Sequence, residues 1–102
     1  MIFTGTVAES FKKDMGYAHR EFLNNLPAAM KDTPYQISDN NKITVTLEQG
    51  QLIIHLGEQM YRNIASISLP YMTVSFVFTD INEVDRTRFY RQFQRSYQKG
   101  GG

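Results

Sequence analysis

The chain contains no cysteine among its 102 residues and only two histidines. The absence of cysteine excludes a disulfide framework, a zinc–thiolate site and catalysis by a thiol. It also makes a reducing cytoplasm the expected compartment. Neither His19 nor His55 has a second ligand in local register, such as a histidine four residues further along a helix. We therefore expect neither a metal site nor a histidine-based active site.

Long apolar runs are absent as well. No stretch approaches the roughly 20 apolar residues that cross a bilayer, and the start, MIFTGTVAES, lacks the basic and apolar segments of a signal peptide. We expect neither secretion nor membrane insertion. Apolar residues still make up 41% of the chain and charged residues 21%, which is typical of globular proteins. The composition predicts one domain over residues 1–99 and a flexible tail at residues 100–102.

The sequence signatures of common enzymes are also missing. The chain has no glycine-rich phosphate loop, no G-x-S-x-G nucleophile elbow and no dinucleotide-binding fingerprint. Because no catalytic set can be assembled from the residues, we expect a protein that is not an enzyme and needs no cofactor.

Apolar residues spaced by fours and threes predict a helix within the first thirty residues. This stripe comprises Val7, Phe11, Met15, Ala18, Phe22, Leu26 and Met30. Thr6 and Glu9 have the spacing of a capping box, which would start the helix. Pro27 should end or kink it near Asn24–Asn25. Gly16 falls in the middle of this helix, where close packing against a neighbouring element is the expected reason for a glycine.

The apolar period then changes from 3.6 to 2, which predicts four strands. They cover residues 43–48, 52–56, 65–69 and 72–79. Gln49–Gly50 should form a tight turn between the first two. Pro70 should end the third, because a proline cannot donate a backbone hydrogen bond to a sheet. Short connections between the strands predict an antiparallel meander.

A final helix is predicted to carry two stripes and to be capped at its start by Asp80 or Asn82. The aromatic stripe is Phe89, Tyr90, Phe93 and Tyr97, and the basic stripe is Arg88, Arg91, Arg95 and Lys99. We expect the aromatic stripe to pack on the sheet and the basic stripe to face water. The predicted fold is therefore an α+β two-layer sandwich: a helix, a four-stranded antiparallel meander and a second helix, with both helices on one sheet face.

The open side of the predicted sheet is the first candidate for function. Its residues are Thr44, Thr46, His55, Ser66, Ser68, Thr73, Ser75 and Val77, with Ile53 as a second apolar exception beside Val77. Such a face can simply contact water, but hydroxyl residues with a few aliphatics also suit contact between two sheets. Because two-fold homodimers are common among soluble proteins, we favour a protein-binding or adaptor module that self-associates through this face.

The basic stripe is the second candidate. Five of the eleven basic residues lie between Arg86 and Lys99, a segment without an acid, although the formal net charge is only +1. These cations could bind phosphate groups, and Tyr90 or Tyr97 could stack on a base. The alternative is that they complement the helix dipole and remain solvated. Anion or nucleic-acid binding is therefore the second hypothesis.

The chain ends in three glycines, Gly100 to Gly102. A C-terminal Gly-Gly resembles the tail of ubiquitin-like sulfur carriers, whose free carboxylate is adenylated and converted to a thiocarboxylate. The resemblance covers these three residues and implies a carrier protein modified at Gly102. In that family the tail follows a strand of a β-grasp fold, whereas here it follows the basic helix. A frayed terminus is the interpretation we favour.

Overall fold

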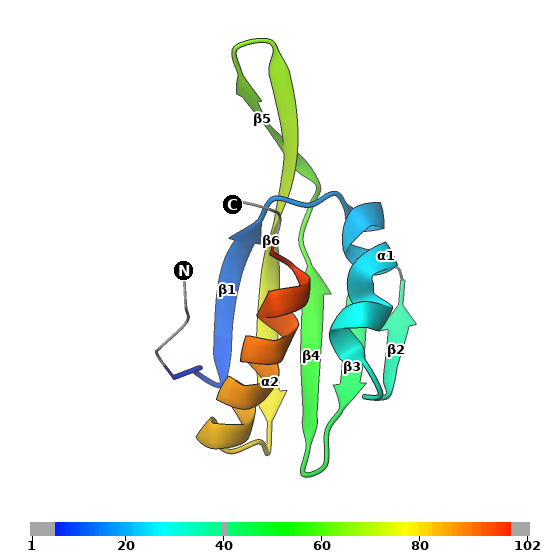
Figure 1. Ribbon diagram of the computed structural model, residues 1–102, viewed down its shortest axis with the longest axis vertical. Coiled ribbons are helices and arrows are strands. Elements are labelled where there is room, and N and C mark those ends of the chain that lie inside the picture. The colour runs from blue at the N-terminus through cyan, green and yellow to red at the C-terminus, as the bar shows by residue number, and fades with distance from the viewer. Residues whose placement is uncertain (1–5, 40, 99–102) are drawn as a thin grey trace.

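The order of elements is a strand, a helix, five strands and a second helix. The computed structural model describes residues 6–39 and 41–98. The elements are β1 (Ser10–Met15), α1 (His19–Met30), β2 (Tyr35–Ser38), β3 (Lys42–Thr46), β4 (Gln51–Leu56), β5 (Met60–Ile64), β6 (Ile67–Thr79) and α2 (Glu83–Ser96) (Figure 1). The predicted α+β class is confirmed.

All the strands belong to one antiparallel sheet with the order β1-β6-β4-β3-β2, and β5 pairs with β6. The long strand β6 is central to it. The second half of β6 lies between β1 and β4, and its first half pairs with β5. Residues 60–71 therefore form a two-stranded arm that projects beyond the body of the domain (Figure 1). We call this segment the arm.

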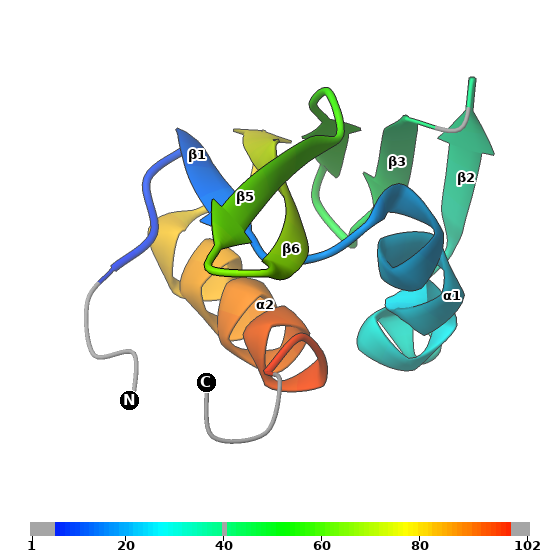
Figure 2. The same cartoon turned by 90° about the horizontal axis from the view of Figure 1, so that it is seen from above.

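The two helices cover one face of the sheet and leave the other face open (Figure 2). Alternate side chains of the strands are buried beneath the helices. They include Ile43, Val45, Leu52, Ile54, Leu56, Met72, Val74, Phe76 and Phe78. The helices contribute Phe22, Leu26 and Met30 from α1 and the aromatic stripe from α2 to the same core.

The aromatic stripe of α2 is buried as predicted. Phe93 is 1% exposed, and its ring meets that of Phe76 edge-on with 5.5 Å between centroids. The Tyr97 hydroxyl donates a 2.7 Å hydrogen bond to the Phe22 carbonyl of α1. The predicted cap is also confirmed, because the Asn82 side chain accepts a 2.8 Å hydrogen bond from the Asp85 backbone N–H.

The predicted N-terminal helix is wrong in its first half. Residues from Ser10 to Met15 form β1, and α1 begins only at His19. Thr6 and Glu9 therefore do not cap a helix. Ala18 occupies the cap position instead, and its backbone N–H donates to the Glu21 side chain at 3.1 Å.

Pro27 and Gly16 also differ from expectation. Pro27 lies inside α1, which continues without a break to Met30. Ala29 and Met30 beyond it are fully buried, and this burial offsets the backbone hydrogen bond that a proline cannot make. Gly16 lies in the bend between β1 and α1. A Cβ there would come no closer than 4.0 Å to the Pro70 carbonyl oxygen, so close packing does not explain this glycine.

The strand predictions are confirmed in part. The hairpin of β3 and β4 is where it was expected, with Gln49–Gly50 in its turn. The predicted strands at 65–69 and 72–79 are instead one strand, β6, that runs through Pro70. Pro70 lies in the arm, where β6 pairs only with β5 among the described strands, and prolines are tolerated at such edges. The four-stranded meander is therefore wrong, because β1, β2 and β5 were not predicted.

Candidate functional site

Residues 6–39 and 41–98 contain no group of three His, Cys, Asp or Glu side chains placed to hold a metal ion. His19 is half-buried, and its Nε2 atom lies 2.7 Å from the Gly57 carbonyl oxygen. His55 is exposed on the open face of the sheet. In the same part of the chain, neither helix combines the length and apolar character needed to cross a membrane.

The open face brings together six of the eight predicted interface residues. Strand register places Thr44 beside Ile53 and Ile53 beside Val77 in one row. The next row places His55 between Lys42 and Ser75. Thr46 and Thr73 lie on the same side, because side chains alternate along a strand. Strand β1 adds Lys12 beside Ser75 and Asp14 beside Thr73, whose hydroxyl donates a 2.7 Å hydrogen bond to the Asp14 carboxylate. This face is therefore a mixed surface of hydroxyl, aliphatic, basic and acidic side chains.

Ser66 and Ser68 lie elsewhere. Ser66 is in the turn at the tip of the arm, and Ser68 pairs with Asn63 of β5. Alternation along β6 places Ser68 on the side opposite to Thr73. The expectation that these two serines share the open face is therefore wrong, because the third predicted strand is the first half of β6 and belongs to the arm.

The arm concentrates exposed apolar side chains. Eight large apolar residues are exposed in the described chain, and five of them lie in the arm: Met60, Tyr61, Ile64, Ile67 and Leu69. Ile64 is 55% exposed and Ile67 is 58% exposed. The two residues are directly opposite each other in the ladder, so their side chains lie on one face of the arm. An apolar cluster of this kind is typical of an interaction surface.

One face of the arm continues into the open face of the sheet. The register pairs Met60 with Tyr71, Arg62 with Leu69 and Ile64 with Ile67. On β6, the residues of these pairs lie on the same side of the strand as Thr73, Ser75 and Val77, because side chains alternate along a strand. The Arg62 guanidinium lies over the Tyr71 ring, 4.5 Å from its centroid. The arm and the open face therefore form one continuous surface.

The arm could not be predicted from the sequence, because its turn lacks the residues that usually mark a hairpin. Two-residue hairpin turns normally use Asn-Gly or Asp-Gly, since these residues accept a positive φ. Here the turn is Ala65–Ser66, and Ala65 has φ 54°. The only available signal for the first strand of the arm was the even spacing of the apolar residues Met60 and Ile64, and the charged Arg62 between them interrupts the apolar face.

The base of the arm is fixed by Gln59. Its Oε1 atom accepts a 2.8 Å hydrogen bond from the His19 backbone N–H. Its amide nitrogen donates to the Tyr71 carbonyl at 3.0 Å and to the Met60 carbonyl at 3.3 Å. One side chain therefore ties the start of α1 to both strands of the arm.

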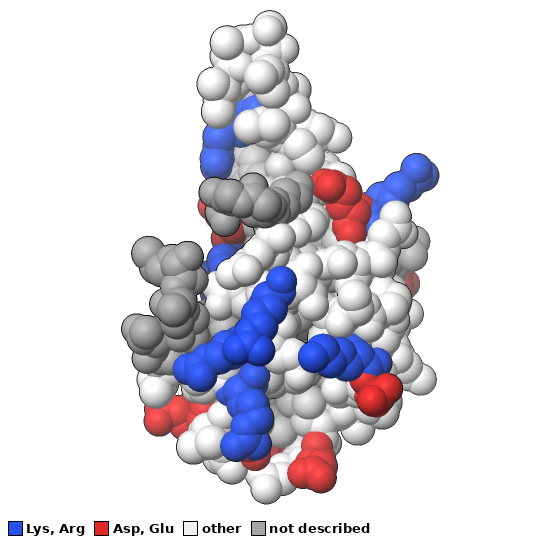
Figure 3. Space-filling view, in the orientation of Figure 1, with Lys and Arg blue, Asp and Glu red and all other residues white. Residues whose placement is uncertain are grey.

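The described members of the basic stripe are Arg88, Arg91 and Arg95 of α2, which lies on the helical side of the molecule (Figure 3). Arg88, Arg91 and Arg95 line a surface hollow of about 600 Å³ together with Lys31, which follows the end of α1. Lys31 was not among the predicted anion-binding residues. The Gln92 side chain donates a 3.1 Å hydrogen bond to the Ala29 carbonyl, which holds the end of α1 beside α2. We call this set of four cations the basic groove.

Two other sequence expectations about this helix have a definite outcome, and a third has none. Tyr90 and Tyr97 are only 5% and 7% exposed. The prediction that either ring could stack on a base is therefore wrong. Arg86 is tied to the protein itself, because it donates 2.8 Å hydrogen bonds to the carbonyls of Val7 and Ile81. Lys99, the fourth member of the predicted stripe, lies outside the described residues.

The glycines of the carrier hypothesis, Gly100 to Gly102, also lie outside the described residues. Comparisons with protein-family models, with curated proteins and with solved structures find no match to this chain. The functional argument therefore depends on the chemistry of two surfaces of the chain itself, the arm with the open face and the basic groove.

Proposed function

We propose that this domain is a non-enzymatic protein-binding module that associates with a second copy of itself through the arm and the adjoining open face. The observation that carries the proposal is the apolar cluster on the arm. Water contact with Met60, Ile64, Ile67 and Leu69 has a free-energy cost of roughly 25 cal/mol per Å² of apolar surface, and a contact that covers these side chains removes it.

The charge of the arm favours a second copy as the partner. Arg62 is the only charged residue between Met60 and Tyr71. In a two-fold contact each surface meets an identical surface, so a strongly charged patch would repel itself. An apolar arm with one cation, which already lies over the Tyr71 ring, avoids most of this repulsion.

The size of a stable interface favours the participation of the open face. A typical interface covers about 800 Å² on each partner and involves roughly 20–30 residues a side. The arm, residues 60–71, supplies too few residues for this by itself. The hydroxyl and aliphatic side chains of Thr73, Ser75, Val77 and Ile53 continue the same surface and supply the rest.

Sedimentation velocity tests the proposal directly. We expect the full chain to form a concentration-dependent dimer and the Ile64→Ser/Leu69→Ser variant to be monomeric with an unchanged circular dichroism spectrum. Val84→Ser is the matched control, because Val84 is an apolar residue of α2 that is 64% exposed. This variant should dimerise like the wild type.

Two results would overturn the proposal. A wild-type chain that remains monomeric at its highest soluble concentration would exclude self-association. Equal loss of dimer in the arm variant and in Val84→Ser would place the contact elsewhere. A different protein held by the same arm would appear as a complex that the arm variant loses while the wild-type chain alone stays monomeric, and the second-copy proposal would then be wrong.

A further inference from the structure

The basic groove carries positive charge that the described protein leaves largely unneutralised. The only ion pair between described residues joins Arg88 to Asp85 at 3.3 Å, and the Arg88 side chain is 76% exposed. Lys31, Arg91 and Arg95 have no acid of the described chain within ion-pair distance. Figure 3 shows Lys and Arg side chains gathered over α2 and a separate cation over the end of α1, where an acidic side chain lies beside it.

Helix dipoles do not explain the whole patch. The dipole stabilises cations within the last turn of a helix, which accounts for Arg95 at the end of α2 and for Lys31 at the end of α1. Arg88 and Arg91 lie in the middle of α2, where the dipole contributes little. Arg88 pairs with Asp85, so Arg91 is the cation that neither a helix dipole nor an ion pair between described residues explains.

The backbone conformation of Lys31 also supports a role for the cations of the groove. Lys31 has φ 55° and ψ −118°, a conformation that glycine adopts readily and that other residues adopt at a cost. The chain nevertheless places a long cationic side chain there, beside Arg88, Arg91 and Arg95 in the lining of the groove. A charge that is useful in the groove would offset the strained backbone.

The shape and lining of the groove favour a compact anion. Its volume of about 600 Å³ lies within the range of small-molecule sites. Arg88 and Arg95 are seven residues apart on α2, which is about 10 Å along a helix axis, so a single phosphate cannot reach both. Guanidinium groups match phosphate oxygens in pairs. None of the described residues that line the groove is aromatic, so residues 6–39 and 41–98 offer a base no stacking partner there.

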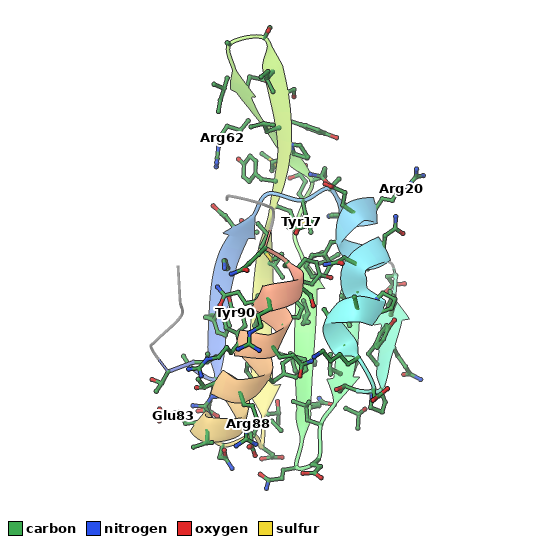
Figure 4. The ribbon with its side chains drawn as sticks, in the orientation of Figure 1. Tyr17, Arg20, Arg62, Glu83, Arg88 and Tyr90 are labelled. Carbon is green, nitrogen blue, oxygen red and sulfur yellow. The ribbon has the colours of Figure 1, made fainter. Side chains whose placement is uncertain are left out.

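We infer that the basic groove binds a di- or triphosphate group and recognises its phosphates only. Arg91 and Arg95 contact the central and terminal phosphates, and Lys31 adds a third cation from the facing helix end. Glu83 lines the same groove and lies at the start of α2 near Arg88 (Figure 4). The carboxylate of Glu83 repels an anion at the Arg88 end of the groove. A free oligophosphate and the phosphate tail of a nucleotide share this chemistry.

Calorimetric titration of the full chain with inorganic triphosphate at low salt tests the inference. We expect saturable binding that weakens roughly tenfold in the Arg91→Ala/Arg95→Ala variant. A tenfold change corresponds to about 1.4 kcal/mol, which two exposed charge pairs can together contribute. Glu83→Gln should bind several-fold more tightly. Arg20→Ala is the matched control, because Arg20 is an exposed arginine on α1, far from Arg88 (Figure 4). Its affinity should not change.

Lys31→Gly separates a ligand site from a structural role. Glycine relaxes the backbone at this position, so the variant should melt at the same temperature as the wild type or higher while it binds triphosphate several-fold more weakly. Weaker binding together with a lower melting temperature would indicate that Lys31 supports the fold and would remove it from the site.

The source of the phosphate is distinguished by a second series of ligands. Inorganic triphosphate and nucleoside triphosphates with different bases should bind with similar affinity, because the described lining offers no aromatic ring to a base. Strong preference for one base would contradict recognition of the phosphates alone. Saturable binding of a DNA duplex without binding of triphosphate would make the groove a nucleic-acid surface and overturn the inference, as would equal losses in Arg20→Ala and Arg91→Ala/Arg95→Ala.

Discussion

Tyr97 joins the two helices at a buried position. Its hydroxyl donates to the Phe22 carbonyl at 2.7 Å, and its ring stacks on that of Phe22 with centroids 4.6 Å apart. Burial raises the pKa of Tyr97 well above its ordinary value of 10, and the nearby Tyr17 and Tyr35 raise it further. The folded domain therefore keeps this phenol protonated over the pH range in which an ordinary tyrosine begins to ionise.

This burial predicts a loss of stability in alkaline solution. Above pH 10 the phenol ionises in the unfolded chain while it stays protonated in the folded domain, so the unfolded state binds fewer protons and the free energy of unfolding falls. The slope for one such group is about 1.4 kcal/mol per pH unit. Burial also raises the pKa of Tyr17 and Tyr90, and these groups add to the fall in stability. The Tyr97→Phe variant should therefore lose only the part of the slope that Tyr97 contributes. Urea unfolding between pH 9 and pH 11 measures this, and identical slopes for the two proteins would contradict it.

Single residues differ in how far the sequence determines their environment. Phe93 and Arg91 were placed correctly on opposite sides of α2, because a helical period of 3.6 separates them. Lys31 could not be assigned to the basic groove in the same way. Its position beside Arg91 depends on the packing of α1 against α2, which includes the hydrogen bond from Gln92 to the Ala29 carbonyl.

At the scale of elements, β1 shows why an apolar spacing can mislead. Phe11 and Met15 are four residues apart, and an even spacing fits one face of a strand as well as one face of a helix. Between them, the inward-facing position is occupied by Lys13, whose ammonium lies 5.9 Å from the Tyr90 ring centroid. The alternation that would identify the strand is therefore masked by a lysine.

The final helix and the hairpin of β3 and β4 were predictable for the opposite reason. Their local signals agree with the packing that they enter: Asn82 at the cap, aromatic residues on one side of α2, and Gly50 in the turn. A Cβ at Gly50 would lie 2.0 Å from the Thr79 carbonyl oxygen, so only glycine fits there. In the arm, no local sequence signal of this kind is present. A two-stranded ribbon has little stability of its own, and the hydrogen bonds of Gln59 hold the arm to the body of the domain.

Gln59→Ala should therefore loosen the arm without unfolding the domain. The substitution removes the hydrogen bonds from Gln59 to the Tyr71 and Met60 carbonyls and from the His19 backbone N–H to Gln59. Loss of such half-buried bonds costs about 1–3 kcal/mol, which corresponds to a roughly 5- to 150-fold loss of amide protection. Hydrogen exchange should show this loss in residues 60–71 and not in β3 or β4.

The control for this experiment is Gln51→Ala, which changes an exposed glutamine of β4. It should leave the protection of the arm unchanged. A uniform decrease across the whole sheet in Gln59→Ala would mean that the arm unfolds only with the body, and that Gln59 does not anchor it separately.

Across the whole molecule, the two proposed surfaces are well separated. The basic groove lies on the helical side of the sheet, and the open face is on the other side (Figure 2). Along the longest axis, Arg62 of the arm and Arg88 of the groove lie toward opposite ends (Figure 4). A dimer formed through the arm and the open face therefore leaves the basic groove accessible to solvent.

Salt should affect the two activities in opposite directions. The contact between copies is mainly apolar, and one row of the open face holds Lys42, His55, Ser75 and Lys12. Its two lysines bring like charges together when two open faces meet. Screening reduces this repulsion, since the Debye length falls from about 10 Å at 0.1 M salt to about 3 Å at 1 M. The dimer dissociation constant should therefore stay constant or decrease as salt rises. Attraction between the basic groove and triphosphate is screened by the same ions, so its dissociation constant should increase.

Sedimentation velocity and calorimetric titration over one series of salt concentrations measure both constants on the same preparation. The Ile64→Ser/Leu69→Ser variant should keep the salt dependence of triphosphate binding while it stays monomeric at every concentration. The Arg91→Ala/Arg95→Ala variant should dimerise like the wild type and lose most of the salt-dependent binding. A dimer that dissociates as salt rises would indicate that opposite charges, such as Asp14 and Lys42 of the open face, hold the two copies together. The apolar arm would then not carry the contact, and the proposal would be wrong in that respect.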